Sequence, residues 1–187
     1  MYTHSDLRKG LKILINGEPY IITDFEFYKP GKGQALYRCK MRNMINGNQY
    51  NETFRSNDKF EKPDLEERSM QYLYEQNGEY YFMDNKSYDQ VFLTNDQLGE
   101  HVNYLVDNME VQVLLFDNRP IDISLPNFVN LEVILADPWI KGDTSSTDSK
   151  LVTVETGYKL QVPPFVEKGN KIQIDTRSGE YITRVKE

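Results

Sequence analysis

Short stretches of alternating apolar and polar residues run along most of the chain. Residues 11–15 (LKILI) alternate with a period of two, and Asn16-Gly17 behind them is typical of a tight hairpin turn. Asn46-Gly47 and Asn77-Gly78 repeat that signal. Strands are predicted, from their Tyr, Val, Ile and Phe content, over 35–45, 50–54, 70–76, 79–84, 88–93, 110–116, 121–125, 128–136, 151–154, 158–162, 171–175 and 181–185.

One helix stands out among these strands. Thr94 is a predicted N-cap and Gln97 the third helical residue, which together make a capping box. Leu98, Val102 and Leu105 follow at helical spacing and share one face. Short strands with tight turns and a single helix favour an all-β protein built of small β-barrels over a parallel sheet with crossover helices.

Two prolines suggest where the chain divides. Pro63 lies in a polar stretch, and Pro126 interrupts two strand-like runs. Proline lacks the N–H that a strand ladder needs, so both places suit junctions. We therefore predict three domains, over residues 1–63, 64–126 and 127–187, with no sequence repeat between them.

Charge is spread unevenly over these three segments. The 187 residues have a net charge of −7. The first segment holds 11 Lys+Arg and 7 Asp+Glu, the second 3 and 13, and the third 8 and 9. The asymmetry suggests a first domain that faces a polyanion and a middle domain that avoids it. A merely solubilising acidic surface is the alternative for the middle domain.

Composition excludes several classes of protein. A single cysteine rules out an intramolecular disulfide framework. With only two histidines in addition, the chain has few zinc ligands, which makes a zinc site improbable. There is no apolar run long enough to cross a membrane, and residues 1–20 do not read as a secretory signal. We expect a cytoplasmic protein without metal or cofactor.

The most informative stretch is a basic hairpin over residues 27–42. No acid occurs between Glu26 and Glu52. Alternation places Arg38, Lys40 and Arg42 on one side of a strand, where they can follow a phosphate backbone. An ordinary solvated strand face is the alternative.

The tip of this hairpin, Lys29-Pro30-Gly31-Lys32-Gly33, adds specificity. Two glycines leave Lys32 without neighbouring side chains, and Pro30 fixes the approach. The amine of Lys32 is thus held out at the end of a protrusion, where it can enter a narrow cleft or be enlarged by a modifying enzyme. An ordinary exposed turn lysine is the competing interpretation.

Catalytic residues do not emerge from the sequence. His4 lies near a terminus, His101 lies within the predicted helix, and Cys39 alternates with apolar residues as a buried side chain does. Arg177 and Arg184 near the C-terminus either contact RNA or pair with acids. We find no argument for an enzyme.

Taken together, several motifs resemble the bacterial elongation factor P family over essentially the whole chain. They comprise Lys29-Pro-Gly-Lys-Gly-Gln-Ala35, Pro126-Asn-Phe-Val129, Lys141-Gly-Asp-Thr144, Val162-Pro-Pro-Phe-Val166 with Gly169, and Asp175-Thr-Arg-Ser-Gly-Glu-Tyr181 with Arg184. The resemblance implies an SH3-like (KOW-type) domain followed by two OB-folds in an L-shaped arrangement like that of tRNA.

The resemblance also implies a function. Such a factor binds both ribosomal subunits between the peptidyl and exit sites, as a monomer, and relieves stalling at consecutive prolines. Lys32 is the position that a lysine-modifying enzyme extends. The implied contacts with peptidyl-tRNA and ribosome are Lys29, Pro30, Gly31, Lys32, Gly33, Arg38, Lys40 and Arg42. Lys141, Gly142, Asp143 and Thr144 would approach the exit-site mRNA codon, and Arg177, Tyr181 and Arg184 would contact RNA.

Two other interpretations remain open at this point. The elongation factor P-like paralogue shares the architecture, and its tip lysine is unmodified. An OB-fold protein that binds single-stranded nucleic acid away from the ribosome is the second. The hypusine-containing factor of eukaryotes and archaea shares only the first two domains.

Overall fold

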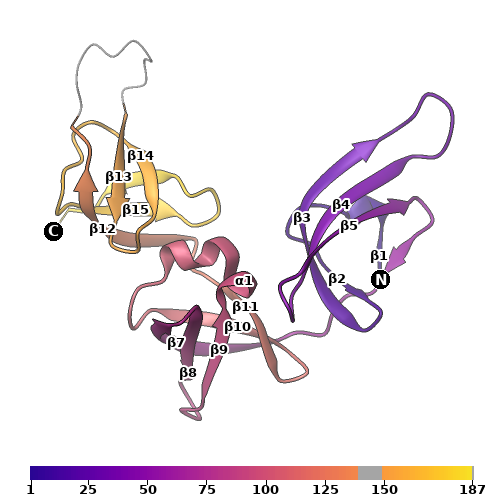
Figure 1. Cartoon of the computed structure of the whole chain (residues 1–187), viewed down its shortest axis with the longest axis horizontal. Coiled ribbons are helices and arrows are strands. Elements are labelled where there is room, and N and C mark those ends of the chain that lie inside the picture. The colour runs from indigo at the N-terminus through magenta and orange to yellow at the C-terminus, as the bar shows by residue number, and fades with distance from the viewer. Residues whose placement is uncertain (139–148, 187) are drawn as a thin grey trace.

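Three β-domains form an open V in the computed structural model, which describes residues 1–138 and 149–186 (Figure 1). The middle domain lies at the vertex, and the first and third domains diverge from it. This arrangement confirms the all-β class and the L-shaped architecture. No helix among the described residues is long and apolar enough to span a lipid bilayer.

The first domain is a four-stranded antiparallel sheet closed by a two-stranded ribbon. Its elements are β1 (Tyr2–Thr3), η1 (His4–Asp6), β2 (Lys12–Ile15), β3 (Glu18–Tyr28), β4 (Leu36–Asn43), β5 (Gln49–Arg55) and β6 (Lys59–Phe60), with β1 pairing β6. Ile13, Ile22 and Met41 are almost fully buried in its core. Asn16 and Gly17 both take positive φ, as the predicted hairpin turn requires.

The middle domain is a five-stranded antiparallel sheet in the order β11-β10-β7-β8-β9. Its elements are β7 (Glu66–Gln76), β8 (Glu79–Asp84), β9 (Gln90–Thr94), α1 (Asn95–Leu98), η2 (Gly99–Tyr104), β10 (Glu110–Phe116) and β11 (Arg119–Ser124). Phe82, Leu93 and Val113 lie at the centre of its core. Asn77-Gly78 forms the β7–β8 turn with both residues at positive φ, as predicted.

The predicted helix begins where expected and ends early. The hydroxyl of Thr94 accepts from Gln97 N, and the side chain of Gln97 accepts from Thr94 N, so the capping box is confirmed. The expected continuous helix through Leu105 is wrong. Gly99 leaves helical geometry at φ 55°, and the chain continues as a 3-10 helix. Leu98 and Leu105 are nevertheless both buried in the middle core.

The third domain is again a five-stranded antiparallel sheet, ordered β14-β13-β12-β15-β16. Its strands are β12 (Phe128–Ala136), β13 (Lys150–Val154), β14 (Lys159–Val162), β15 (Lys171–Asp175) and β16 (Tyr181–Arg184). Leu131, Val133 and Ile172 are fully buried at its centre. Tyr104, the last residue of η2, packs into this core from the middle domain.

A small apolar cluster and a polar latch join the first domain to the middle domain. Met44 packs with Leu114 and Ile121 across the junction. Gln97 Nε2 donates to the carbonyl oxygens of Met44 (3.3 Å) and Ile45 (3.1 Å), and also to that of Pro120 (3.3 Å). A Cβ at Gly47 would lie 2.8 Å from Asp96 Cβ, so the two domains meet closely there.

The single cysteine is buried, as its alternation predicted. Cys39 is 2% exposed, and burial raises the pKa of its thiol from 9.0 to about 11. The folded protein therefore keeps the proton to a higher pH than the unfolded chain does. We expect the free energy of unfolding to fall by about 2 kcal/mol between pH 9 and pH 11 because of this group, and to be unaffected by it below pH 9. Denaturant titrations of wild type and Cys39→Ala across that range would check this, since only wild type carries the extra decline.

Candidate functional site

The hairpin of β3 and β4 extends well beyond the body of the first domain (Figure 1). Lys29 and Lys32 are exposed in the loop that joins the two strands. An added Cβ on Gly31 would meet no atom within 4 Å, and Gly33 has φ +123°, a region that favours glycine. The tip therefore presents Lys32 to solvent on a backbone with little side-chain packing, as predicted.

One face of this hairpin carries the predicted cations, and acids from β3 lie opposite them. Lys40 Nζ lies 3.0 Å from Asp24 Oδ2, and Arg38 Nη1 lies 3.7 Å from Glu26 Oε2. The hydrogen bond from Lys40 is the main reason that the pKa of Asp24 lies below its ordinary value. All four side chains are more than half exposed, so water screens both pairs and phosphate can replace the acids.

The opposite face of the hairpin is aromatic. Phe27 pairs with Tyr37 across the strands, with ring centroids 5.2 Å apart, and Tyr37 also lies 6.3 Å from the ring of Phe25. On the cation face, near the tip, the guanidinium of Arg38 lies over the ring of Tyr28 at 5.2 Å. These contacts stiffen the hairpin, whose strand β4 also pairs with β5 as far as Leu36. Phe25 and Tyr37 pack in addition against the core of the first domain.

Arg42 shares the face of Arg38 and Lys40, but its guanidinium is already engaged. Its Nη1 donates to the carbonyl oxygens of Asp96 and Gln97 at the end of α1. Arg42 is half-buried between the first and middle domains. In this structure it therefore ties the base of the hairpin to its neighbour, and its predicted contact with phosphate stays a prediction.

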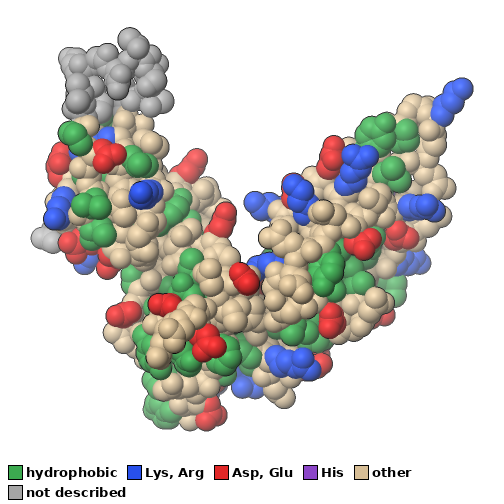
Figure 2. Space-filling model, viewed as in Figure 1, with side chains coloured by type: hydrophobic (Ala, Val, Ile, Leu, Met, Phe, Trp, Pro, Cys, Tyr) green, Lys and Arg blue, Asp and Glu red, His purple; other side chains and the backbone are tan. Residues whose placement is uncertain are grey.

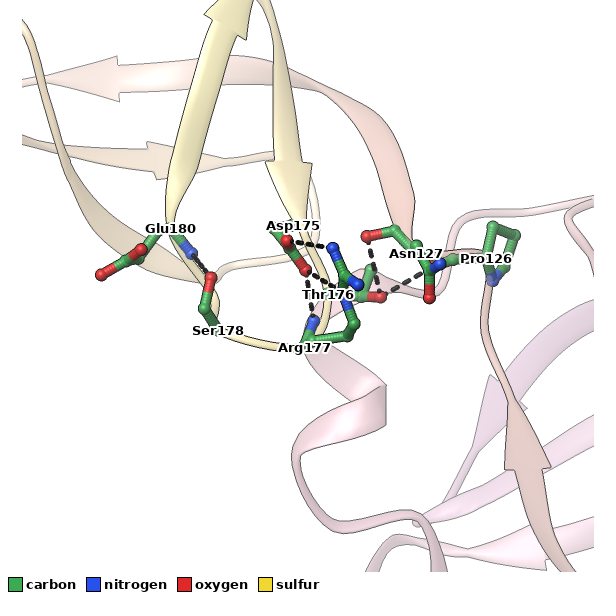
Figure 3. Close-up of polar contacts among 7 residues, drawn as sticks. All are labelled: Pro126, Asn127, Asp175, Thr176, Arg177, Ser178 and Glu180. Atoms are coloured by element: carbon green, nitrogen blue, oxygen red, sulfur yellow. Dashed lines mark hydrogen bonds and ion pairs between the residues drawn. The ribbon is translucent and has the colours of Figure 1, made fainter.

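The candidate arginine at the end of β15 is also paired (Figure 3). Arg177 Nη2 lies 2.8 Å from Asp175 Oδ2 and its Nε lies 3.0 Å from Oδ1, while its guanidinium lies 5.5 Å from the ring centre of Phe128. These hydrogen bonds lower the pKa of Asp175 and raise that of Arg177. The adjacent Thr176 donates from Oγ1 to the carbonyl of Pro126 at 2.7 Å, which holds this turn against the domain junction.

Of the remaining candidates in the third segment, the structure describes Tyr181 and Arg184. Arg184 is exposed and lies 5.4 Å from the ring centre of Phe165, while Tyr181 packs against the core. Neither position tests the predicted RNA contacts. Lys141, Gly142, Asp143 and Thr144 lie outside the described residues.

The sequence did not predict the structural role of one glycine in the motif of residues 175–181. Gly179 has φ +77°, and an added Cβ would lie 2.4 Å from the hydroxyl oxygen of Tyr158 and 3.1 Å from that of Tyr104. Tyr158 donates its hydroxyl to the Gly179 carbonyl at 3.0 Å. Gly179 thus lets the β15–β16 turn close over two tyrosines, one of which comes from the middle domain.

We expect Gly179→Ala to destabilise the third domain by about 2–4 kcal/mol. The cost combines a positive φ that alanine adopts poorly with a clash against two packed rings. Thermal unfolding of the full chain would measure it. Gly157→Ala is the matched control, because Gly157 has a similar φ of +86° and open space around it. Equal losses in the two variants would contradict the packing argument.

Comparison with known proteins covers all three domains. Residues 3–60 match the domain described as "Elongation factor P (EF-P) KOW-like domain", residues 65–123 match "Elongation factor P (EF-P) OB domain", and residues 129–184 match "Elongation factor P, C-terminal". The chain belongs to the elongation factor P family. It is 70% identical over 187 residues to Elongation factor P of Desulfotalea psychrophila, with 100% of both chains covered.

A second relative agrees with this assignment to the elongation factor P family. The chain is 61% identical to Elongation factor P of Syntrophus aciditrophicus over 186 residues, again with 100% of both chains covered. It is also similar to a solved structure, Eukaryotic translation initiation factor 5A from Methanococcus jannaschii, over 66% of this chain and 90% of that one, at 23% identity and a TM-score of 0.47. Family membership makes the chain a translation elongation factor, and it places the Lys32 hairpin within the KOW-like domain.

Proposed function

We propose that the chain binds the ribosome between the peptidyl and exit sites and stimulates peptide-bond formation at consecutive prolines. In this proposal the hairpin of β3 and β4 contacts the acceptor end of the peptidyl-tRNA, and Lys32 reaches toward the reacting groups. The observation that carries it is the exposed, glycine-flanked Lys32 at the tip of a long hairpin in a member of the elongation factor P family. The protein would act in the cytoplasm.

Positioning alone can supply the required acceleration. Proline is a constrained secondary amine, so the geometry of its attack on the ester is demanding. A group that restrains the tRNA end lowers an entropic barrier without taking part in the chemistry. A gain of about 10–100-fold in rate needs only ~1.4–2.7 kcal/mol, which a few charge-assisted contacts can provide.

The proposal includes a covalent extension of Lys32 by a modifying enzyme. The lysine amine lies at the end of the protrusion, where an enzyme can reach it without unfolding the domain. Added length would extend the reach of the tip beyond that of a bare side chain. Mass spectrometry of the tip peptide from protein isolated from its own host tests this part separately.

Contacts of the third segment of the chain are proposed from sequence alone. Lys141, Gly142, Asp143 and Thr144 would approach the small subunit and the exit-site codon. Arg177 and Arg184 lie in the same domain and carry the charge that RNA contacts need. Tyr181 begins the strand that ends at Arg184 and would also contact RNA.

The deciding experiment is reconstituted translation of a reporter with three consecutive prolines. Reactions would contain no factor, recombinant protein, or protein isolated from its own host, with a reporter lacking the prolines as the matched control. Full-length product that rises only for the proline reporter supports the proposal. Ribosome binding without rescue would favour the paralogue interpretation, and absence of binding would refute the ribosomal role.

The exposed cations of the hairpin give a separate prediction about ionic strength. We expect Arg38→Ala and Lys40→Ala each to weaken ribosome binding and to reduce the slope of log affinity against log salt by about 1. Arg119→Ala is the control, because it removes an exposed cation from the middle domain. Binding measured at several salt concentrations would check the slopes, and unchanged slopes for both hairpin variants would mean that neither side chain meets phosphate.

A further inference from the structure

Three aromatic rings form a continuous row across the outer face of the middle sheet. Tyr74 on β7 pairs with Tyr81 on β8, and Tyr81 pairs with Phe92 on β9. The rings of Tyr74 and Tyr81 are stacked, with centroids 4.9 Å apart and planes at 21°, and that of Phe92 lies 5.8 Å further on. We call Tyr74, Tyr81 and Phe92 the aromatic row.

The aromatic row contributes little to the core of its own domain. On β8 and β9 the neighbouring residues Phe82 and Leu93 point inward and are buried. On β7 a register shift after Tyr72 leaves Tyr72 buried and Tyr74 outside. By contrast, Tyr74 is 44% exposed and Phe92 is 46% exposed. Large adjacent rings on a solvent-facing sheet mark a contact surface rather than a folding requirement.

Charge around the aromatic row is negative. Between residues 71 and 94 the chain carries Glu75, Glu79 and Asp89 against a single cation, Lys86, while a fourth acid, Asp84, is buried. The carboxylate of Glu79, in the next row of the same face, accepts the hydroxyl of Tyr81 at 2.6 Å. Figure 2 shows hydrophobic side chains among Asp and Glu over the middle domain.

The negative charge distinguishes between two classes of ligand that bind exposed aromatic rings, nucleic-acid bases and cationic side chains. Nucleic acid stacks its bases on such rings, but its affinity depends on cations that neutralise phosphate, and the middle segment has a charge of −10 from 3 Lys+Arg and 13 Asp+Glu. Arg and Lys side chains, in contrast, gain from both the ring faces and the carboxylates.

We propose that the aromatic row binds an Arg- or Lys-rich segment of another protein. Cationic side chains would lie on the exposed ring faces of Tyr74 and Phe92, while Glu79 would take a direct ion pair at the edge of the row. The inference rests on ring geometry, exposure and charge, and it does not depend on the proposed role in translation.

A peptide titration with the full chain tests this proposal. The probe is a fluorescein-labelled twelve-residue peptide of alternating Arg and Gly, followed by fluorescence anisotropy. We expect Tyr74→Thr and Phe92→Thr each to weaken binding about two- to fivefold, because exposed cation–π contacts have that strength. Phe92→Tyr keeps a ring and should retain binding. Glu79→Gln should weaken binding without removing a ring.

Controls separate the aromatic row from the general attraction of an acidic protein for a basic peptide. Tyr88→Asn removes a ring that is 70% exposed in the β8–β9 turn and outside the row, at φ +62°, which Asn tolerates. It should leave binding unchanged. Circular dichroism of each variant would confirm the fold.

Three outcomes would overturn the proposal. Equal affinity of the peptide for wild type and for Tyr74→Thr/Phe92→Thr would show that the row is not the site. Binding of a twelve-nucleotide uridine RNA that the double variant loses would assign the row to nucleic acid. Self-association in sedimentation that the double variant loses would assign it to a second copy of this chain.

Discussion

Lys32→Ala is expected to abolish the stimulation of synthesis through three consecutive prolines, a loss of about 10–100-fold in rate at the stall, and to leave the fold intact. The side chain is exposed, its glycine neighbours carry no packing, and the tip lies beyond the core of the first domain. The rate of full-length synthesis and thermal unfolding of the same preparation would measure the two effects together.

Two companion variants sharpen this test of Lys32. Lys32→Arg keeps a positive charge at the tip but removes the amine that a modifying enzyme would extend, so loss of function in it would point to the extension rather than the charge. Lys29→Ala removes a cation from the same loop and should reduce rescue far less. Normal rescue by Lys32→Ala would remove the tip from the mechanism.

Gln97→Glu is expected to loosen the junction between the first and middle domains and to destabilise the chain by about 2–4 kcal/mol. The change keeps the acceptor that caps α1 through Thr94 N. It replaces an amide that donates to Met44, Ile45 and Pro120 carbonyls with a carboxylate that cannot donate. Buried carbonyls would lose their partner and face a negative charge.

The expected consequence is a wider spread of distances between the hairpin tip and the middle domain. Spin labels on the tip loop and on the β8–β9 turn would report that spread, and denaturant unfolding would report the stability. Asn95→Asp makes the same chemical change two residues earlier, on an exposed side chain, and should alter neither the distances nor the stability. If the distance distribution for Gln97→Glu is as narrow as that of wild type, the hydrogen bonds from Gln97 do not hold the two domains together.

Local signals predicted most of the fold because this protein is made of short, sequential hairpins. The Asn-Gly turns at 16–17 and 77–78 adopt the positive φ values that their chemistry favours. Alternation predicts Cys39 and Met41 inside and Arg38 and Lys40 outside, and the structure confirms all four positions. The pattern predicts no strand over Glu18–Tyr28, because acids interrupt its run of apolar residues.

Contacts between distant residues limited what the sequence could predict. Three backbone carbonyls far from Gln97 in sequence decide the role of this residue, and composition carries no sign of them. The ion pairs of the hairpin can be predicted from the sequence. If the hairpin turns at Lys32, residue 24 pairs with residue 40 and residue 26 pairs with residue 38, as the structure shows. The division at Pro63 and Pro126 and the RNA contacts of the third domain stay predictions.

The ring of Tyr104 belongs to the middle segment of the chain but lies in the core of the third domain. The third arm of the V therefore cannot swing without withdrawing an aromatic ring from an apolar interior and breaking the hydrogen bond from Thr156 Oγ1 to the Asn103 carbonyl at 2.6 Å. The angle between the middle and third domains is therefore set by packing when the chain folds, so this joint need not be ordered on binding.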